Sequence, residues 1–513
     1  MTYLTVAIMV DTVETAIAQA AIAAERGADL VEFRIDRLPQ AAEQVGELVS
    51  RSPLPCIVTC RPDWEGGEYD GEEADRQAII AAALDAQPAY LDLEVAAYRV
   101  DPAWRQIIDN RRETSVILSS HDFQTRPADL LRRISAMAEV EACHVVKLAW
   151  RARSLRDNLE AFELLGAPPK RMIALCMGEP GQPSRVLAKK FGALLTFAGL
   201  EDDTVTAPGQ VGVQTLKQLY RWDAIDRDTQ VFGVVGFPVG HSLSPHIMNA
   251  GFTETGHNGV YLPLPIPDDY VHFKATVGSW LDFAPLDFRG ASVTIPHKHN
   301  LLKFAAERNG EIEPLAQQIG AANTLTVRDD GSIFVSNTDY AAVLDSVCAA
   351  MGIERESLAG KRVAILGAGG AARAAAAGFA HYGARVTVYN RTLAKAEKLA
   401  GAFENVTAAP LEAIQQAEAD ILVNCTPIGM HPNTDATPLP DWPDSLGKNT
   451  IVFDTIYNPM QTKLLADAAA RGCVTITGVE MFVRQAAAQF QQWTGQPAPT
   501  QTFEQVIRER LNV

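Results

Sequence analysis

Residues 361–392 constrain the fold of this chain more strictly than any other stretch. An apolar run at 362–366 leads into the glycine turn Gly367–Ala372, an alanine-rich segment follows, and a second apolar run ends at Asn390. This order is typical of a strand, a tight turn, a helix and a second parallel strand that together bind a dinucleotide. Gly367 permits the turn, Gly369 lets the backbone approach a pyrophosphate, and the helix N-terminus faces the anion. We therefore predict a Rossmann lobe around this turn.

The residues after the second strand indicate which dinucleotide binds. An acidic residue at this position would bind the ribose hydroxyls of NAD. This chain has Asn390, Arg391 and Thr392 instead, with Lys395 nearby, so a 2′-phosphate fits better and the pattern favours NADP. The alternative is a glycine loop that only turns the chain, with Arg391 as a solvated surface residue.

Length and composition limit the class of protein. A chain of 513 residues is too long for one core, and about two to four domains are expected. The net charge of −17 argues against a nucleic acid or an anionic membrane as partner. Seven scattered cysteines without metal spacing predict reduced thiols in the cytoplasm. The apolar run at 3–10 is too short for a signal peptide, and no stretch is long enough to span a membrane.

The first 220 residues alternate short apolar runs with helix-like segments, which predicts an α/β fold of the (β/α)8 barrel type. The eight runs are Leu4–Met9, Leu30–Arg34, Cys56–Cys60, Tyr90–Glu94, Ser115–Ser119, Val145–Ala149, Met172–Met177 and Leu194–Phe197. Polar residues lie at or after the C-terminal ends of these runs, and in a barrel such ends converge on one catalytic face. The alternative is a ring of structural salt bridges, which would explain one or two of these residues but not all of them.

Lys147 lies inside one of these apolar runs. Burying an ammonium is costly and favours the neutral amine, which is a nucleophile for a carbonyl group. The alternative is a buried lysine that a carboxylate such as Glu94 keeps charged. Because His121 follows the preceding strand, we favour a Schiff-base lysine with a general acid/base.

Four motifs give the first 220 residues a resemblance to the type I 3-dehydroquinate dehydratases: Val31–Arg34, Ser120–Phe123, Val146–Ala149 and Thr206–Gln210. The resemblance implies that Lys147 forms an imine with the substrate ketone. It also implies that His121 removes the adjacent ring proton and helps to expel the hydroxyl as water, and that Arg185 holds the substrate carboxylate. The other implied substrate-binding residues are Glu32, Arg34, Arg61, Glu65, Thr206 and Gln210. Thr206 replaces the serine common in this family, but the hydroxyl is kept.

The second half carries its own reactive residues. Ser242 and Ser244 lie two positions apart before a helix-like segment, where they could bind a carboxylate or hydroxyls, or simply cap the helix. Lys298 and Asp339 lie among small polar residues, and such a pair can exchange a proton with a substrate hydroxyl while a hydride passes to a nicotinamide. Histidines flank Lys298 at 297 and 299, but without a third ligand we expect no metal.

Residues 231–513 resemble shikimate dehydrogenase through an ordered set of motifs that runs from Ser242–Pro245 to Gly478–Gln485. The resemblance implies Lys298 and Asp339 as the catalytic pair. Implied substrate ligands are Ser242, Ser244, Thr294, Asn323, Tyr457 and Gln485. Implied NADP ligands are Gly367, Gly369, Gly370, Ala371, Asn390, Arg391, Thr392, Thr426 and Gly478. Ser292 departs from the asparagine of many single-domain members, but the fused plant-type enzymes are more similar there.

Together the two resemblances imply four segments and one pathway. We expect a dehydratase barrel at 1–225, a substrate-binding lobe at 230–336, a Rossmann NADP lobe at 337–476 and C-terminal helices at 477–513 that return to the substrate lobe. Such a chain would dehydrate 3-dehydroquinate and reduce the product to shikimate with NADPH. It would act on small molecules in the cytoplasm without an obligate protein partner. The alternatives are a fusion that prefers quinate with NAD, or a non-catalytic ligand-sensing regulator.

Overall fold

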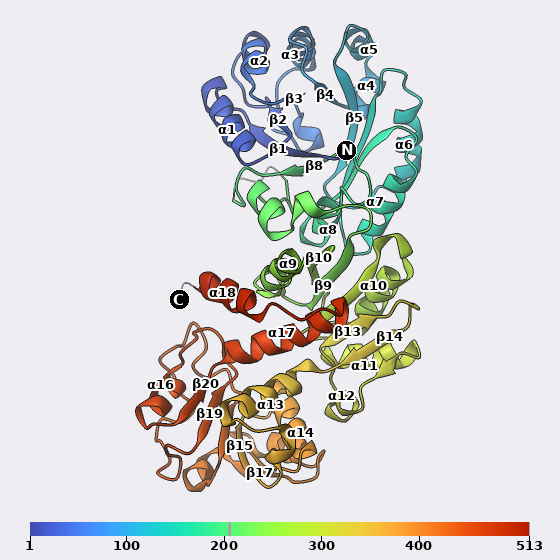
Figure 1. Cartoon of the computed structure of the whole chain (residues 1–513). Helices are drawn as coiled ribbons and strands as arrows, with labels where there is room; N and C mark the ends of the chain where they lie inside the picture. Colours follow the sequence, from blue (N-terminus) through green and yellow to red (C-terminus); the bar gives the residue numbers. More distant parts are fainter. Residues whose placement is uncertain (204–206, 512–513) are drawn as a thin grey trace. The chain divides into compact units, whose positions relative to one another are not determined.

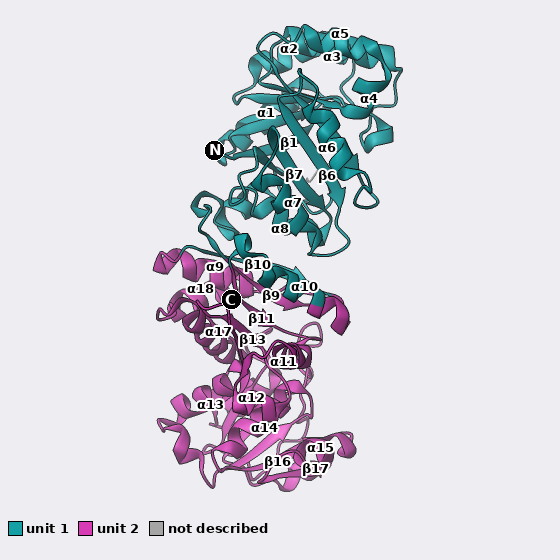
Figure 2. Cartoon of the chain, turned by 90° about the vertical axis from the view of Figure 1, so that its right-hand side faces the viewer, with its two compact units in different colours: residues 1–230, 258–266, 275–287 teal, residues 231–257, 267–274, 288–513 magenta. Residues whose placement is uncertain are grey.

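The computed structural model describes residues 1–203 and 207–511. The chain forms two compact units. One contains residues 1–230, 258–266 and 275–287, and the other contains residues 231–257, 267–274 and 288–513 (Figure 2). The expected boundaries at 225–230, 336–337 and 476–477 stay predictions.

Eight parallel strands in the order β7-β6-β5-β4-β3-β2-β1-β8 build the first unit (Figure 1). They are β1 (Tyr3–Met9), β2 (Leu30–Arg34), β3 (Cys56–Thr59), β4 (Tyr90–Glu94), β5 (Ser115–Asp122), β6 (Val145–Arg151), β7 (Arg171–Met177) and β8 (Leu195–Ala198). The sheet nearly closes between its end strands β7 and β8. The amide of Leu194, directly before β8, donates to the carbonyl oxygen of Met172 in β7 at 2.9 Å. The predicted barrel fold is confirmed.

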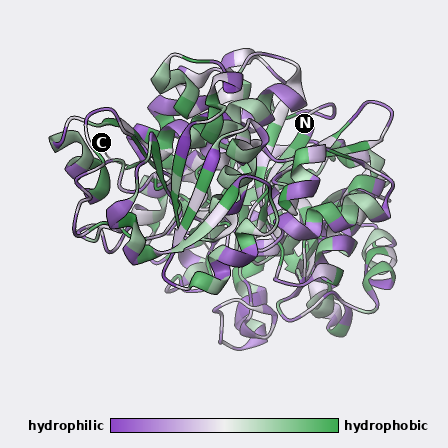
Figure 3. Cartoon of the chain, turned by 90° about the horizontal axis from the view of Figure 1, so that it is seen from below, coloured by the Kyte–Doolittle hydropathy of each residue, from purple (hydrophilic) through white to green (hydrophobic). Residues whose placement is uncertain are grey.

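The barrel strands are buried along most of their length because parallel strands are covered on both faces; all four residues of β3 are buried. The intervening helices are α1 (Val13–Glu25), α2 (Ala41–Arg51), α3 (Glu73–Asp85), α4 (Val95–Val100), α5 (Pro102–Asp109), α6 (Leu130–Ala138), α7 (Asp157–Gly166) and α8 (Gln182–Val186). The buried positions of α1, namely Val13, Ala16, Ala20 and Ala23, recur every three or four residues. Figure 3 shows such mixing of hydrophilic and hydrophobic residues within helices, as one covered face requires.

β5 is three residues longer than predicted. His121 and Asp122 lie in the strand rather than after it, opposite Ala149 and Trp150 of β6. The extension occurs because β6 itself continues to Arg151 and supplies backbone partners. His121 is therefore held by a strand, which fixes its direction more firmly than a loop would.

The remaining strands form two six-stranded sheets. The first has the order β10-β9-β11-β13-β14-β12. Its strands are β9 (Gln230–Gly236), β10 (Gly259–Pro265), β11 (Phe288–Val293), β12 (Glu311–Ile312), β13 (Thr324–Val327) and β14 (Ile333–Ser336). The helices in this part of the sequence are α9 (Ser244–Thr255), α10 (Tyr270–Asp282), α11 (Lys298–Glu307) and α12 (Pro314–Ile319).

The last sheet is parallel, with the order β17-β16-β15-β18-β19-β20. Its strands are β15 (Arg362–Leu366), β16 (Arg385–Asn390), β17 (Val406–Pro410), β18 (Ile421–Asn424), β19 (Ile451–Asp454) and β20 (Val474–Ile476). Its helices, with those that follow, are α13 (Thr338–Met351), α14 (Gly370–His381), α15 (Leu393–Ala400), α16 (Lys463–Ala470), α17 (Gly478–Thr494) and α18 (Thr500–Leu511). The strand order reverses between β15 and β18, where doubly wound sheets bind ligands. The predicted Rossmann fold is confirmed. In the described residues no helix is both long and apolar enough for a membrane span.

Two candidate active sites

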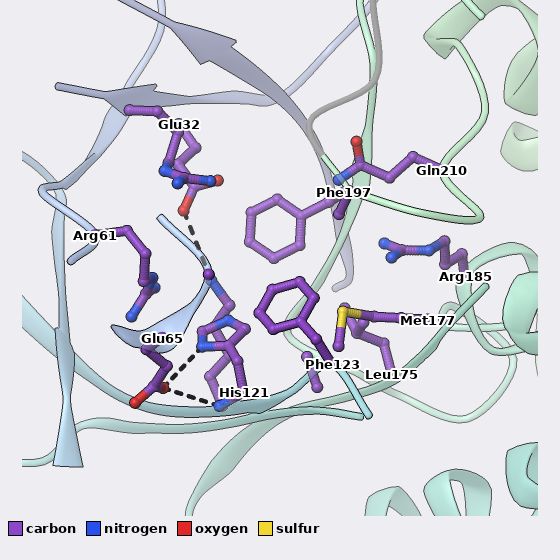
Figure 4. Close-up of a pocket in the computed structure, with 15 residues that line it drawn as sticks. Glu32, Arg61, Glu65, His121, Phe123, Leu175, Met177, Arg185, Phe197 and Gln210 are labelled. Atoms are coloured by element: carbon purple, nitrogen blue, oxygen red, sulfur yellow. Dashed lines mark hydrogen bonds and ion pairs between the residues drawn. The ribbon is translucent and has the colours of Figure 1, made fainter. Parts of the chain in front are cut away.

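A pocket with about 510 Å³ of empty space opens at the C-terminal ends of the barrel strands (Figure 4). It brings together the predicted dehydratase residues Glu32, Arg34, Arg61, Glu65, His121, Lys147, Arg185 and Gln210. Thr206 lies outside the residues that the structure describes. The apolar wall of the pocket, formed by Phe123, Leu175, Met177 and Phe197, was not predicted as part of the site. The signal that could have found it is the position of these residues at strand ends, beside the predicted polar ones.

Lys147 is 4% exposed on β6 and pairs with a different carboxylate from the one considered above. Its Nζ lies 2.7 Å from Asp92 Oδ2 and 3.6 Å from Glu32 Oε1, and 4.5 Å from the centre of the Phe197 ring. Glu94 is not its partner, because the Glu94 oxygens accept hydrogen bonds from Arg61 and Arg76. Burial alone would raise the pKa of Asp92, but the Arg61 and Lys147 cations outweigh it and hold that pKa well below its ordinary value. Lys147 thus faces an ionised carboxylate.

His121 and Glu65 form a hydrogen-bonded pair at the same pocket (Figure 4). His121 Nδ1 lies 3.0 Å from Glu65 Oε1, and the His121 amide donates to the same oxygen at 2.8 Å. Burial, with the Arg61 and Lys147 cations, lowers the pKa of His121 well below 6.5, so the imidazole is a neutral base at neutral pH. Burial also raises the pKa of Glu65 to about 7. The pair can therefore hold or release one proton between the two side chains near neutral pH.

Arg185 is a buried cation with free donors. It is 1% exposed, its Nη2 makes a long 3.5 Å contact with Pro208 O, and its Nε and Nη1 have no hydrogen-bond partner among the described residues. Burial lowers its pKa to about 10. A buried guanidinium whose donors have no protein partner can bind a substrate carboxylate at the pocket wall, because a carboxylate can accept two parallel hydrogen bonds.

The other two arginines of the pocket already have anionic partners. Arg34 Nε donates to Asp36 Oδ1 at 3.2 Å, and Arg61 Nη2 donates to Asp92 Oδ1 at 2.6 Å. The structural salt bridges considered from the sequence therefore exist for these two residues. Their predicted contacts with substrate hydroxyls stay predictions.

A second pocket has about 780 Å³ of empty space. It is lined by the predicted catalytic pair Lys298 and Asp339, by Gly478, predicted as an NADP ligand, and by the predicted substrate ligands Ser242, Ser244, Thr294, Asn323, Tyr457 and Gln485. Lys298 begins α11 and Asp339 lies in the first turn of α13. Lys298 Nζ donates to Asp339 Oδ2 at 2.5 Å, and Asn323 Nδ2 donates to Asp339 Oδ1 at 3.0 Å. Both carboxylate oxygens are thus held, and the lysine side chain is still 32% exposed.

Two further contacts define the walls of this pocket. The Ser244 amide donates to Ser242 Oγ at 3.2 Å, but the N-cap of α9 is Leu243, without a side-chain cap bond. The Ser242 hydroxyl can still donate to a ligand. The Tyr457 ring stacks on Phe482 with centroids 5.3 Å apart. Ser242 and Tyr457 can therefore present hydroxyl groups to the same ligand.

Gln489 lines the second pocket and was missed. It accepts from Ser292 Oγ at 2.7 Å, and its Nε2 donates to Asn323 O at 3.2 Å and Thr324 Oγ1 at 3.0 Å. Its position one helical turn after Gln485 was the available signal, since residues four apart share a helix face. Ser292 is thereby tied to helix α17.

The histidines beside Lys298 offer no metal site. His297 is fully buried, its Nδ1 lies 2.9 Å from Asn300 Nδ2, and its ring centre lies 4.9 Å from that of Phe273. It is a core residue. Across residues 1–203 and 207–511, no group of three or more His, Cys, Asp or Glu side chains could hold a metal ion.

The glycine turn fits a dinucleotide. Gly367 has φ +101°, which favours glycine, and its amide donates to Tyr389 O at 2.8 Å, so the turn adjoins the end of β16. A Cβ at Gly369 or Gly370 would meet no protein atom within 4 Å, which leaves the N-terminus of α14 open to a pyrophosphate. Arg391 follows β16 directly and is exposed, where the acid of an NAD site would lie.

Family models match along the chain. The model described as type I 3-dehydroquinase matches residues 4–227, and that of the shikimate dehydrogenase substrate binding domain matches 234–325. The shikimate / quinate 5-dehydrogenase model matches 349–453, and the shikimate 5'-dehydrogenase C-terminal domain matches 478–508.

Individual proteins are similar over the same regions. The chloroplastic bifunctional 3-dehydroquinate dehydratase/shikimate dehydrogenase of Arabidopsis thaliana is 36% identical over 98% of this chain and 83% of its own. The shikimate dehydrogenase (NADP(+)) of Moorella thermoacetica is 39% identical over 56% of this chain and 95% of its own. The structure of shikimate 5-dehydrogenase from Thermus thermophilus with NADP(H) and shikimate is 33% identical, with a TM-score of 0.47, over 55% of this chain and 99% of that one.

Proposed function

The chain belongs to the bifunctional 3-dehydroquinate dehydratase/shikimate dehydrogenase family, and from this premise we propose how its residues divide the work. The first half dehydrates 3-dehydroquinate to 3-dehydroshikimate, and the second half reduces that ketone to shikimate, so both act on small molecules of the shikimate pathway. One observation carries the assignment of residues: each unit gathers one reactive set in one pocket. These sets are Lys147 with His121, and Lys298 with Asp339.

In the barrel, we propose that Lys147 attacks the substrate ketone. The lysine is paired with Asp92, so it must lose one proton before it attacks. The amine adds to the carbonyl carbon, and the carbinol hydroxyl leaves as water with the proton that the lysine lost, so the imine forms while His121 stays neutral for the next step. Arg185 holds the substrate carboxylate and so fixes the ring over the lysine.

Elimination follows on the covalent intermediate. His121 takes the proton from the ring carbon next to the imine, the carbon–oxygen bond at the following carbon breaks, and the hydroxyl leaves as water with the proton that His121 returns. Glu65 holds Nδ1 of the imidazole and keeps it in the direction of transfer. A second water hydrolyses the imine and restores Lys147, so the net change is the loss of one water.

In the second half, reduction of the ketone needs a proton at the carbonyl oxygen. Lys298 supplies this proton from its ammonium group. Asp339 accepts a hydrogen bond from the same ammonium group, and Asn323 holds the Asp339 carboxylate in place. Bound NADPH supplies the hydride. The hydroxyls and amides that line the pocket, Ser242, Ser244, Thr294, Tyr457 and Gln485, bind the substrate carboxylate and hydroxyls.

NADP rather than NAD is proposed as the cofactor. The support is the cation Arg391 where an NAD site would have an acid, and relatives that are named as NADP(+) enzymes. A preference for quinate with NAD and a non-catalytic sensor are both less favoured, because Arg391 and both reactive sets are present. We also propose that the enzyme works in the cytoplasm without an obligate partner. All seven cysteines are free thiols, as expected in a reducing compartment.

The test follows nicotinamide absorbance with purified full-length protein. With 3-dehydroquinate, the wild-type chain should oxidise NADPH, because both halves work in series. Lys147→Ala should stop oxidation from 3-dehydroquinate and leave that from 3-dehydroshikimate intact. Arg391→Ala should lower the affinity for NADPH roughly ten- to a hundredfold, because a charge-assisted contact is worth about 1.5–3 kcal/mol. The affinity for NADH should change little. A wild-type chain that oxidises NADPH with 3-dehydroshikimate but not with 3-dehydroquinate would contradict the dehydratase assignment. Equal losses of affinity for NADPH and NADH in Arg391→Ala would show that Arg391 is structural.

A further inference from the structure

Asp454 is a buried carboxylate outside both reactive sets. It ends β19, is fully buried, and accepts three hydrogen bonds. Asn424 Nδ2 donates to Oδ1 at 3.0 Å, the Ile456 amide donates to Oδ1 at 3.1 Å, and Thr462 Oγ1 donates to Oδ2 at 2.7 Å. No lysine or arginine of residues 1–203 and 207–511 forms an ion pair with it, and burial raises its pKa to about 6. A buried acid that is kept without a cation is costly, so its hydrogen bonds need an explanation.

One branch of the network leads to the cofactor turn. Asn424 Oδ1 accepts from the Thr426 amide at 3.0 Å and from Thr426 Oγ1 at 2.7 Å. Because the Thr426 amide can only donate, the oxygen of Asn424 must face it and the nitrogen must face Asp454. A Cβ at Gly367 would lie 3.1 Å from Thr426 Cγ2, so Thr426 packs directly against the glycine turn.

The other branch leads to the substrate pocket. Asp454 holds the amide of Ile456, which lies between Thr455 and Tyr457, and both of these line the pocket. Thr455 Oγ1 also donates to Asn424 O at 2.9 Å. On the far side of this segment Thr462 binds the carboxylate and caps α16. The Asp454 side chain therefore binds the segment 455–462 near its start, at Ile456, and at its end, at Thr462.

We propose that Asp454 is a positioning residue of the dehydrogenase, which fixes Thr426 beside the cofactor turn and Thr455 and Tyr457 beside the substrate at the same time. It thereby sets the approach of the two reactants. Hydride transfer requires reacting atoms about 3–3.5 Å apart, and a 1 Å misplacement can cost about a hundredfold in rate. The inference rests on the proposed function of this half of the chain.

The test uses full-length variants and two kinds of readout. Asp454→Ala should lower the dehydrogenase kcat roughly ten- to a hundredfold, and calorimetry should show weaker binding of both NADP and shikimate. Asp454→Asn should stay close to wild type, because its carbonyl oxygen can still accept from Asn424 and Ile456. The dehydratase activity of the same preparations should not change, since the barrel lies in the other unit.

Val452→Ala is the matched control. Val452 is fully buried two residues earlier on β19, so this change loosens the same strand without touching the network. Asp454→Ala with kcat and affinities like those of Val452→Ala would overturn the inference, as would an Asp454→Asn variant as impaired as Asp454→Ala.

A second pair of variants applies if Asp454→Ala does not fold. Thr462→Ser keeps the hydroxyl that binds Asp454, and Thr462→Val removes it. The valine variant should lose kcat and affinity while the serine variant keeps them, and equal constants would overturn the inference. A wild-type chain that reduces no 3-dehydroshikimate would overturn the proposed function and the inference together, whereas the outcomes above overturn the inference alone.

Discussion

Among single residues, Lys147 makes the most direct prediction. Borohydride added with 3-dehydroquinate should trap a stable adduct on this lysine, because reduction of the imine makes the bond permanent. His121→Ala should still form the adduct but slow elimination by about 10² to 10⁴, the usual contribution of a general acid/base. Peptide mapping by mass spectrometry identifies the modified residue. Lys190 is the internal control: it is equally buried at 4% exposure, but its Nζ donates to Arg227 O and Thr229 O. An adduct on Lys190, or none at all, would contradict the assignment.

At the scale of strands and helices, the sequence could predict what local patterns encode. β2 and β4 have the predicted bounds, because each is an apolar run that ends at a polar residue. The end of β5 could not be predicted, because it depends on how far β6 continues beside it. The pairing of Lys147 with Asp92 rather than Glu94 was equally inaccessible, since it depends on barrel stagger and on Arg76, which lies on a helix far from Lys147 in sequence. Gln489 was missed although Gln485, one turn earlier on the same helix, was predicted, because its bond to Ser292 depends on tertiary packing that no local pattern encodes.

The extension of β5 leads to a prediction about the loop that it meets. Phe123 follows the strand, and a Cβ at Gly66 would lie 2.1 Å from its ring. Gly66→Ala should therefore displace Phe123 and the adjacent Glu65, and lower dehydratase kcat/KM while dehydrogenase activity stays unchanged. Gly192→Ala is the matched control, because Gly192 has φ +75° against +77° for Gly66 and open space around its Cβ. Both variants bear a left-handed strain of about 1–2 kcal/mol. Equal kcat/KM in the two would show that the collision does not matter.

For the whole molecule, we predict that the two activities separate. Fragments 1–230 and 231–513 should each keep their own reaction, since each contains one complete reactive set and enough chain for a core. A fragment that ends at 225 should have a lower melting temperature than one that ends at 230, because Lys190 would lose both carbonyl acceptors, on Arg227 and Thr229. The first unit also includes residues 258–266 and 275–287, which any cut near 230 removes from it. Activity that returns only when the fragments are mixed would mean that the chain is one cooperative unit.

The buried guanidinium of Arg185 has a consequence for how this protein can evolve. A fall in its pKa from 12.5 to about 10 corresponds to about 3 kcal/mol against the charged form, which the fold sustains whenever no anion is bound. That is a large share of the net stability of a typical domain. Under the proposed role of Arg185 as the carboxylate ligand, selection for thermostability alone would replace it with an apolar side chain, and the barrel would become more stable as it lost substrate binding. The residue therefore persists only under selection for turnover, and a bound carboxylate should act as a stabilising ligand of the barrel.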